Sequence, residues 1–278
     1  MLIMKKALLY IIIFIALQVS ITFGVALVLK YFFPEIDGES PQAITITSIV
    51  IDIAVVALFL GLRWYRIGRD YIRTRPWFEM FWTALLAIGI IIPLAFIEEM
   101  IPEAWRKDSV GDVLVQMLQT TEGYFAICML GPLTEEIVFR GAIITALNRW
   151  IREKEYSLIT KTWIPIVVSA CFFSAIHFNL AQIPHAFIMG LLLGWLFTRT
   201  DSLLLCFLVH WINNSFAYVV AKLYPTLPVD APMTDYFGGN SAAVWQAVVC
   251  SLMIALPSLY QLNRVLRKDK KGGRVWYF

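Results

Sequence analysis

The chain has 278 residues with a formal net charge of +3, and 59% of its residues are hydrophobic while only 15% are charged. Soluble domains carry about 25% charged residues, so this composition excludes an ordinary water-soluble domain. Four cysteines lie singly in apolar runs with no C-x-x-C pair, which favours small buried hydrophobes over disulfides or a zinc cluster. They are Cys128, Cys171, Cys206 and Cys250.

The first apolar run, residues 7–29, follows Lys5 and Lys6 and is apolar almost without interruption. A signal-peptide core has only about 7–15 such residues, so this run predicts a retained membrane span.

Further apolar stretches follow along the chain, and about 20 helical residues are enough to cross a bilayer. The predicted spans are 7–29, 43–62, 77–97, 124–148, 163–183, 184–198, 202–221 and 242–260. The sixth is short, and its boundary with the fifth lies near Pro184. The predicted fold class is all-α: a polytopic transmembrane bundle of about eight helices, forming a single membrane-embedded domain over residues 1–278.

Basic residues indicate the orientation of the bundle, because Lys and Arg concentrate in cytoplasmic loops. With the N-terminus inside, 18 of the 23 Lys and Arg residues fall in inside segments and 4 in outside segments. This distribution predicts that both termini are cytoplasmic. The cluster from Arg63 to Arg75 lies among Trp and Tyr residues, which favours an orientation anchor over an anionic-lipid or nucleic-acid patch.

Ionisable residues inside membrane spans are costly and usually functional. In the fourth span, Glu136 and Arg140 are four residues apart and can pair on one helix face. Such a pair would neutralise itself, but it leaves Glu135 unexplained. The dipeptide Gly131-Pro132 just before them predicts a break or restart of this helix.

Two more spans carry polar residues at helical spacing. His177 follows Phe173 by four residues, and His210 precedes Asn214 by four. A single histidine on an apolar helix is more often a hydrogen-bonded core residue than a catalyst. However, polar groups on three helices need one another, because lipid cannot satisfy them. We therefore predict that they converge on a water-accessible cavity.

The chemistry of this set suggests proton transfer and stabilisation of an oxyanion. A carboxylate held near a histidine can take a proton from water, and a second histidine with an amide can stabilise an oxyanion. Glu135, His177 and His210 could also hold a divalent metal such as zinc, although no H-E-x-x-H signature is present. The sequence leaves metal dependence open, and our working hypothesis is hydrolysis without a tightly held zinc.

These motifs resemble those of the CPBP family, which comprises CAAX prenyl endopeptidases of the Ras-converting type and bacterial Abi and bacteriocin-processing proteins. Three segments match in order: Glu135–Arg140 fits E-E-x-x-x-R, Phe173–His177 fits F-x-x-x-H, and His210–Asn214 fits H-x-x-x-N. Residues 190–203 also resemble this family, and the motif-bearing core covers residues 124–221.

The resemblance implies an intramembrane peptidase, of a family that includes both metallopeptidases and metal-independent, glutamate-dependent enzymes. Glu135 would activate the water with help from His177, and His210 with Asn214 would stabilise the oxyanion. Supporting roles would fall to Glu136, Arg140, Phe173 and Asn213.

Four residues outside the three motifs have predicted roles. Gly190 and Gly194 allow their helix to approach the fifth or seventh span closely. Asp52 is a satisfied polar residue, a partner of the site or a cavity-lining group, of which we favour the first. His185, beside Pro184, is expected at an interface and not in catalysis.

Two alternatives to a peptidase remain. One is a non-catalytic membrane scaffold or bacteriocin-immunity protein on the same fold. The other is an ion-coupled transporter with the buried residues as a relay, which the absence of a paired inverted repeat in the sequence disfavours.

The compact loops are typical of a bacterial plasma-membrane protein. The expected partners are membrane lipid and a peptide or protein substrate: a prenylated C-terminal peptide, a leader or pheromone peptide, or a bacteriocin precursor. A bacterial member would favour leader-type or pheromone peptides. The sequence does not identify the substrate, the oligomeric state or the membrane face to which the site opens.

Overall fold

The computed structural model describes residues 2–68, 70–102, 109–177, 179–227 and 231–266, and within these ranges all regular structure is helical. The first half contains α1 (Leu2–Phe32), α2 (Pro41–Gly61), α3 (Asp70–Arg73), α4 (Trp77–Glu99) and α6 (Ser109–Leu118). The second half contains α10 (Leu158–Ala175), α11 (Gln182–Thr200), α12 (Leu204–Leu223), α13 (Met233–Tyr236) and α14 (Ser241–Val265).

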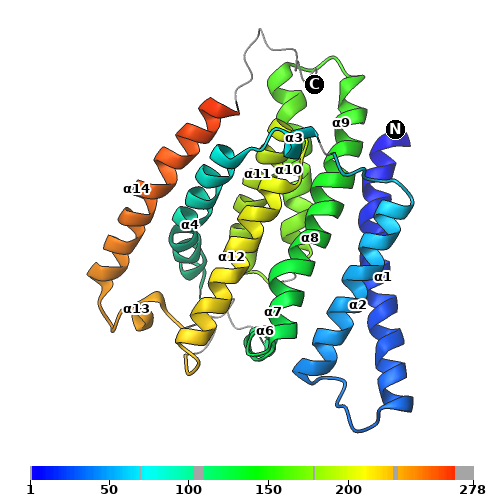
Figure 1. Ribbon diagram of the computed structural model, residues 1–278, viewed down its shortest axis with the longest axis vertical. Coiled ribbons are helices and arrows are strands. Elements are labelled where there is room, and N and C mark those ends of the chain that lie inside the picture. Colours follow the sequence, from blue (N-terminus) through cyan, green and yellow to red (C-terminus); the bar gives the residue numbers. More distant parts are fainter. Residues whose placement is uncertain (1, 69, 103–108, 178, 228–230, 267–278) are drawn as a thin grey trace.

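Between these halves the chain forms one continuous helical run, which we call the motif helix. It comprises α7 (Thr121–Tyr124), η1 (Phe125–Leu130), α8 (Gly131–Glu135), η2 (Glu136–Ile144) and α9 (Thr145–Arg152), where η denotes π-helical turns. In Figure 1 the motif helix runs through the middle of the bundle, with α1 and α2 on one side and α10, α11 and α12 on the other.

Six of the described helices are long and apolar enough to cross a membrane, so the chain is an integral membrane protein with an all-α, polytopic fold. These helices are α1, α2, α4, α10, α12 and α14. The predicted fourth and sixth spans correspond to the motif helix and α11, which do not meet the same criterion. The count of eight spans is therefore not confirmed.

The predicted boundary between the fifth and sixth spans is wrong. Helix α10 ends at Ala175 and α11 begins at Gln182, so the predicted span 163–183 includes a turn. Apolar residues continue through this turn, and hydropathy alone does not reveal it. Pro184 lies in the first turn of α11, where a missing backbone N–H has no partner to lose.

Local side-chain bonds fix where several helices begin. Ser40, Ser157 and Asn240 each precede a helix, and each side-chain oxygen accepts a backbone N–H three residues later at 3.2 Å. Such N-caps satisfy amide groups that the first helical turn leaves unpaired.

Close packing joins α10 to α11, as the two predicted small residues allow. A Cβ atom added at Gly190 would lie 2.9 Å from the Cα of Ala170, and one at Gly194 would lie 2.9 Å from Ile166 Cγ2. The neighbour that these glycines approach is thus the fifth predicted span, which brings the turn carrying His177 under α11.

The cysteines divide into two kinds, and all four are free thiols. Cys128 and Cys206 are buried, as predicted. The prediction of burial is wrong for Cys171 and Cys250, which are exposed on the outer surfaces of apolar helices, where a membrane protein meets lipid rather than water.

Candidate active site

The motif helix does not break at Gly131-Pro132, contrary to our prediction. It continues through Pro132, which occupies the start of α8, and widens into π-helical turns on both sides. The second π segment covers most of the E-E-x-x-x-R motif, from Glu136 to Ile144. Such turns are rare and occur frequently at functional sites.

Pro132 has a direct structural consequence for Asn214. In η1 the Gly131 N–H donates to the Ala126 carbonyl, five residues back. The next bond in this register would run from residue 132 to Ile127, but proline has no N–H. The Asn214 side-chain amide donates to the Ile127 carbonyl instead, at 2.9 Å. Asn214 therefore braces the motif helix at the bond that Pro132 cannot make.

Further polar contacts join α12 to the motif helix on the same flank. The Tyr124 hydroxyl accepts a bond from Trp211 Nε1 at 3.0 Å and lies 3.1 Å from the Ser215 hydroxyl. The Cys128 thiol lies 3.4 Å from the Asn214 carbonyl oxygen. We refer to these contacts, together with the Asn214–Ile127 bond, as the α12 ladder.

The centre of the site is a buried ion pair with a histidine attached. Glu136 Oε1 lies 3.1 Å from Arg140 Nη1 and 2.9 Å from His210 Nδ1. Glu136 and Arg140 are both fully buried, and His210 is 6% exposed. A proton on His210 Nδ1 would be donated to this carboxylate, which also accepts from the Arg140 guanidinium.

Glu135 completes this arrangement from the neighbouring position on the motif helix. Its Oε2 lies 3.6 Å from His210 Nε2, and its side chain is 26% exposed while that of Glu136 is inaccessible. His210 therefore lies between a sealed carboxylate and an accessible one. This arrangement suits proton transfer at Glu135, with Glu136 fixing the orientation of the ring.

The Phe173 ring packs against Arg140 and both histidines of the site. The Arg140 guanidinium lies 4.3 Å from the centre of its ring, a cation–π contact. The rings of His177 and His210 meet Phe173 edge-to-face at 5.0 and 5.8 Å. The phenylalanine of the F-x-x-x-H motif is thus packed against three polar members of the site.

His177 lies in the turn after α10, not inside a span, and it does not pair with Glu135. Its Nδ1 lies 2.8 Å from the Phe173 carbonyl oxygen, to which Nδ1–H donates. No carboxylate of the described residues lies within ion-pair distance of His177, and the histidine beside Glu135 is His210. Among the described residues, no hydrogen bond or ion pair involves His177 Nε2.

Neither asparagine of the third motif is free in this arrangement. Asn214 donates to Ile127, and its Oδ1 accepts a bond from Asn213 Nδ2 at 3.3 Å. An oxyanion role for Asn214 would require its amide to leave the helix backbone.

Several buried polar atoms around this centre have no hydrogen-bond partner among the described residues. They are Glu136 Oε2, Arg140 Nε and Arg140 Nη2. Buried polar groups in proteins are normally paired with protein or water. This cluster of unpaired atoms leaves donors and an acceptor that bound water could satisfy.

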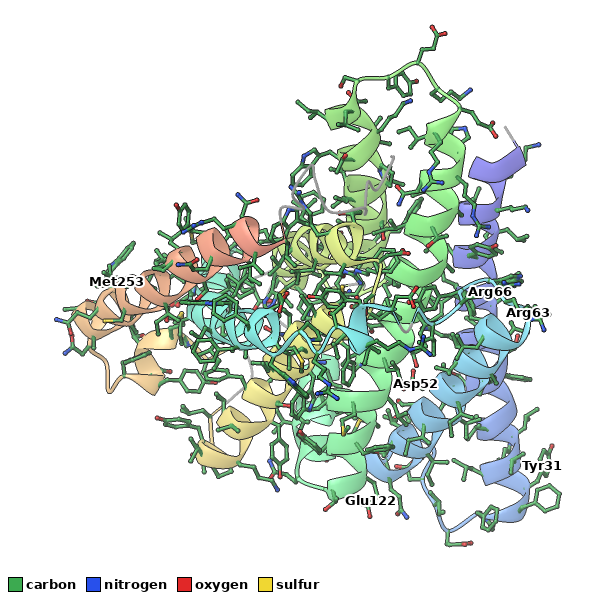
Figure 2. All side chains as sticks on the ribbon, turned by 45° about the horizontal axis from the view of Figure 1, so that its top comes forward. Tyr31, Asp52, Arg63, Arg66, Glu122 and Met253 are labelled. Atoms are coloured by element: carbon green, nitrogen blue, oxygen red, sulfur yellow. The ribbon has the colours of Figure 1, made fainter. Side chains whose placement is uncertain are left out.

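Asp52 of α2 belongs near this site. It is buried, it faces Thr134, and it interacts electrostatically with Glu135. Figure 2 shows it on the side of α2 that faces the motif helix. These contacts fit a satisfied polar residue, the role that we favoured from sequence, and also a partner of the site.

His185 lies apart from the motif residues. Its Nδ1 is 3.1 Å from Glu98 Oε1, so it joins the start of α11 to the end of α4. This fits the predicted interface position. Sequence analysis missed Glu98, since it lies at the end of a span with no motif around it.

The predicted metal ligands do not form a metal site as they stand. No group of three or more His, Cys, Asp or Glu side chains is arranged to hold a metal in the part of the chain that the structure describes. Glu135 and His210 approach each other, but His177 is turned by its bond to Phe173. We therefore derive no catalytic step through a metal.

Comparison with known proteins identifies the region that carries these groups. Residues 118–216 match the family model described as type II CAAX prenyl endopeptidase Rce1-like. The chain is also 30% identical over 101 residues to the membrane-embedded CAAX protease MroQ of Staphylococcus aureus. These two matches support a relation of this region to the CPBP family.

The likeness to MroQ covers 36% of this chain and 40% of that protein. The chain thus aligns with less than half the length of this relative. The family-model match, at residues 118–216, does not extend to α1, α2, α4 or α14. No solved structure matches the chain.

Proposed function

We propose that this protein is an intramembrane endopeptidase that hydrolyses a peptide bond of a membrane-associated peptide or protein. The observation that carries the proposal is the placement of Glu135, accessible and 3.6 Å from a histidine whose other nitrogen is held by a sealed Glu136–Arg140 pair. An orienting carboxylate, a histidine and an accessible second carboxylate form an acid–base set.

In the proposed reaction, Glu135 accepts a proton from a water molecule, and the water oxygen bonds to the scissile carbonyl carbon. The carbonyl electron pair moves onto oxygen. When this intermediate collapses, the C–N bond breaks and the leaving amine takes the proton from Glu135.

The two histidines supply positive charge and orientation in this proposal. When it carries both ring protons, His210 donates through Nδ1 to Glu136 and through Nε2 toward Glu135 or the oxyanion. With Arg140 it then balances the two glutamates, so the buried set is electrically neutral. His177 presents Nε2 to the substrate from the turn after α10. The main role of Asn214 is to keep the motif helix in its π-helical register.

The experiment uses the full chain in lipid vesicles with a panel of membrane-anchored peptides, some prenylated at the C-terminus and some of leader type. Products are detected by mass spectrometry. Glu135→Gln is expected to slow cleavage by about 10²–10⁴-fold, whereas Glu122→Gln, at an exposed position on the same helix, leaves it unchanged.

The outcomes separate the proposed function from its alternatives. Equal cleavage by wild type and Glu135→Gln would refute the role of Glu135. Ion flux that depends on Glu135 without any peptide product would indicate a transporter, and a cellular phenotype that survives Glu135→Gln would indicate a scaffold.

A further inference from the structure

A small polar cavity lies where the start of α1, the end of α2 and the end of the motif helix meet, away from the candidate active site. Its volume is about 80 Å³, enough for several waters or for one tetrahedral oxyanion group. The cavity is lined by Lys6, Tyr10, Trp64, Ala142, Thr145, Ala146 and Arg149.

The charge of this cavity is positive. Lys6 and Arg149 enter from two different helices, and none of the residues that line the cavity is acidic. Neither cation forms an ion pair with any residue in the described ranges, and both reach the surface. Two unpaired cations around a small polar space favour an anion there.

The remaining lining residues give the cavity hydrogen-bond donors and a lining of packed aromatic rings. Tyr10 and Trp64 have ring centres 4.7 Å apart, and Phe59 lies edge-on to Trp64 at 4.9 Å. Tyr10, Trp64 and Thr145 each carry an O–H or N–H that can donate to an anion. Ala142 and Ala146 leave the space that larger side chains would fill.

The position in the bundle identifies the source of the anion. The cavity lies at the end of the bundle where α1 begins and where α2 and the motif helix end (Figure 1), so it lies at the level of lipid headgroups. Arg63 and Arg66, which follow α2, point outward nearby (Figure 2). Basic and aromatic residues at this level are typical of contacts with anionic phospholipid.

We propose that this cavity binds the phosphodiester of an anionic phospholipid headgroup. Lys6 and Arg149 neutralise its charge, and Tyr10, Trp64 and Thr145 donate hydrogen bonds to its oxygens. The lipid chains then run along the apolar outer surface of α1. The site is independent of the proposed peptidase activity, because no residue that lines it belongs to the candidate active site.

The test measures lipid retained by the purified full chain, by native mass spectrometry, after extraction from vesicles of phosphatidylcholine mixed with phosphatidylglycerol. Wild type is expected to retain phosphatidylglycerol in preference to phosphatidylcholine. The double variant Lys6→Gln/Arg149→Gln should lower the affinity for phosphatidylglycerol by about 30-fold, and Lys6→Gln alone by about fivefold.

Two further variants make the test specific. Lys161→Gln/Arg264→Gln removes the same charge from positions outside the cavity and should retain the lipid as wild type does. Ala146→Leu fills the cavity without changing charge and should lose the lipid.

Equal retention by wild type and Lys6→Gln/Arg149→Gln would overturn the proposal, as would full retention by Ala146→Leu. Inorganic phosphate that binds as tightly as the phospholipid would show a site for free phosphate and would also overturn it.

Discussion

At the scale of single residues, the two adjacent glutamates have opposite environments. Glu136 is inaccessible and bonded to both Arg140 and His210, whereas Glu135 is partly exposed and lies 3.6 Å from His210. The Glu136 carboxylate therefore contributes mainly to structure, and the accessible Glu135 carboxylate is positioned for proton transfer.

This difference predicts different costs for the same substitution. Glu136→Gln leaves the Arg140 guanidinium buried without its counter-ion, which should lower the free energy of unfolding by about 3–5 kcal/mol. Glu135→Gln, at the accessible position, should change it by less than about 1 kcal/mol. Thermal unfolding of both variants in detergent checks this, and equal destabilisation would contradict the assignment.

Sequence analysis identified the charged residues of the site but not which histidine meets which carboxylate. Spacing placed Glu136 beside Arg140, and the structure has this pair at 3.1 Å. Spacing along separate helices carries no information on distances between them, so the contact of His210 with Glu135 and the bond of His177 to Phe173 could not be predicted. The roles of Glu135, His177, His210 and Asn214 in catalysis stay predictions.

At the scale of the helix, the way in which Asn214 compensates for Pro132 could not be predicted from the sequence. Proline predicted a break, because in an isolated helix its missing N–H leaves a carbonyl unpaired. Here another helix supplies the donor, and the chain remains helical with π-helical turns around the proline. Only the three-dimensional neighbour of Ile127 decides between the two outcomes.

A double-mutant cycle tests this brace. Asn214→Ala should lower the free energy of unfolding by about 1–3 kcal/mol, because the buried Ile127 carbonyl loses its partner. In a Pro132→Ala background the restored N–H can bond to that carbonyl. There, Asn214→Ala should lower the free energy of unfolding by about 1 kcal/mol less than it does in wild type. Chemical or thermal unfolding of the four proteins gives the coupling.

Cleavage assays on the same four proteins separate bracing from oxyanion binding. If Asn214 acts through the helix, Pro132→Ala/Asn214→Ala regains activity that Asn214→Ala loses. Loss of activity in both backgrounds would assign the amide to the reaction itself. Asn213→Ala is the matched control, since its amide bonds to Asn214 and not to the backbone.

Contact between α10 and α11 gives a second prediction at this scale. Gly190→Val introduces a Cβ that would lie 2.9 Å from Ala170 Cα. Separation of the two backbones should lower the thermal unfolding midpoint and displace the turn that carries His177, at a cost of about 1–3 kcal/mol. Gly24→Val is the control, because no atom lies within 4 Å of its added Cβ, and it should behave as wild type.

At the scale of the whole molecule, composition was sufficient for the fold class and insufficient for the count of spans. Long apolar runs identified α1, α2, α4, α12 and α14 within a few residues of their observed ends. The turn at 176–181 is nearly as apolar as the helices beside it, so no pattern marked it. The lipid-facing positions of Cys171 and Cys250 were missed because hydropathy does not separate protein core from lipid.

Orientation of the bundle is a prediction that labelling can test. The described N-terminal residues, the α9–α10 connection and the end of α14 lie at one end of the bundle (Figure 1). Since 18 of the 23 Lys and Arg residues fall on the predicted inside, we expect this end to be cytoplasmic.

In a background with all four cysteines replaced by Ala, a cysteine at Lys154 should resist a membrane-impermeant maleimide in intact cells. A cysteine at Asp37 should react with it. The reverse pattern would show the opposite orientation.

The α12 ladder also limits which helices of the bundle can move relative to one another. Side-chain bonds and a thiol contact tie α12 to the motif helix at Tyr124, Ile127 and Cys128, so these two helices should shift as one body. On the opposite flank, α2 meets the motif helix mainly through apolar packing. A polypeptide that approaches Glu135 from the bilayer should therefore displace α2 more easily than α12. A cross-link between α2 and the motif helix should block substrate entry on that side.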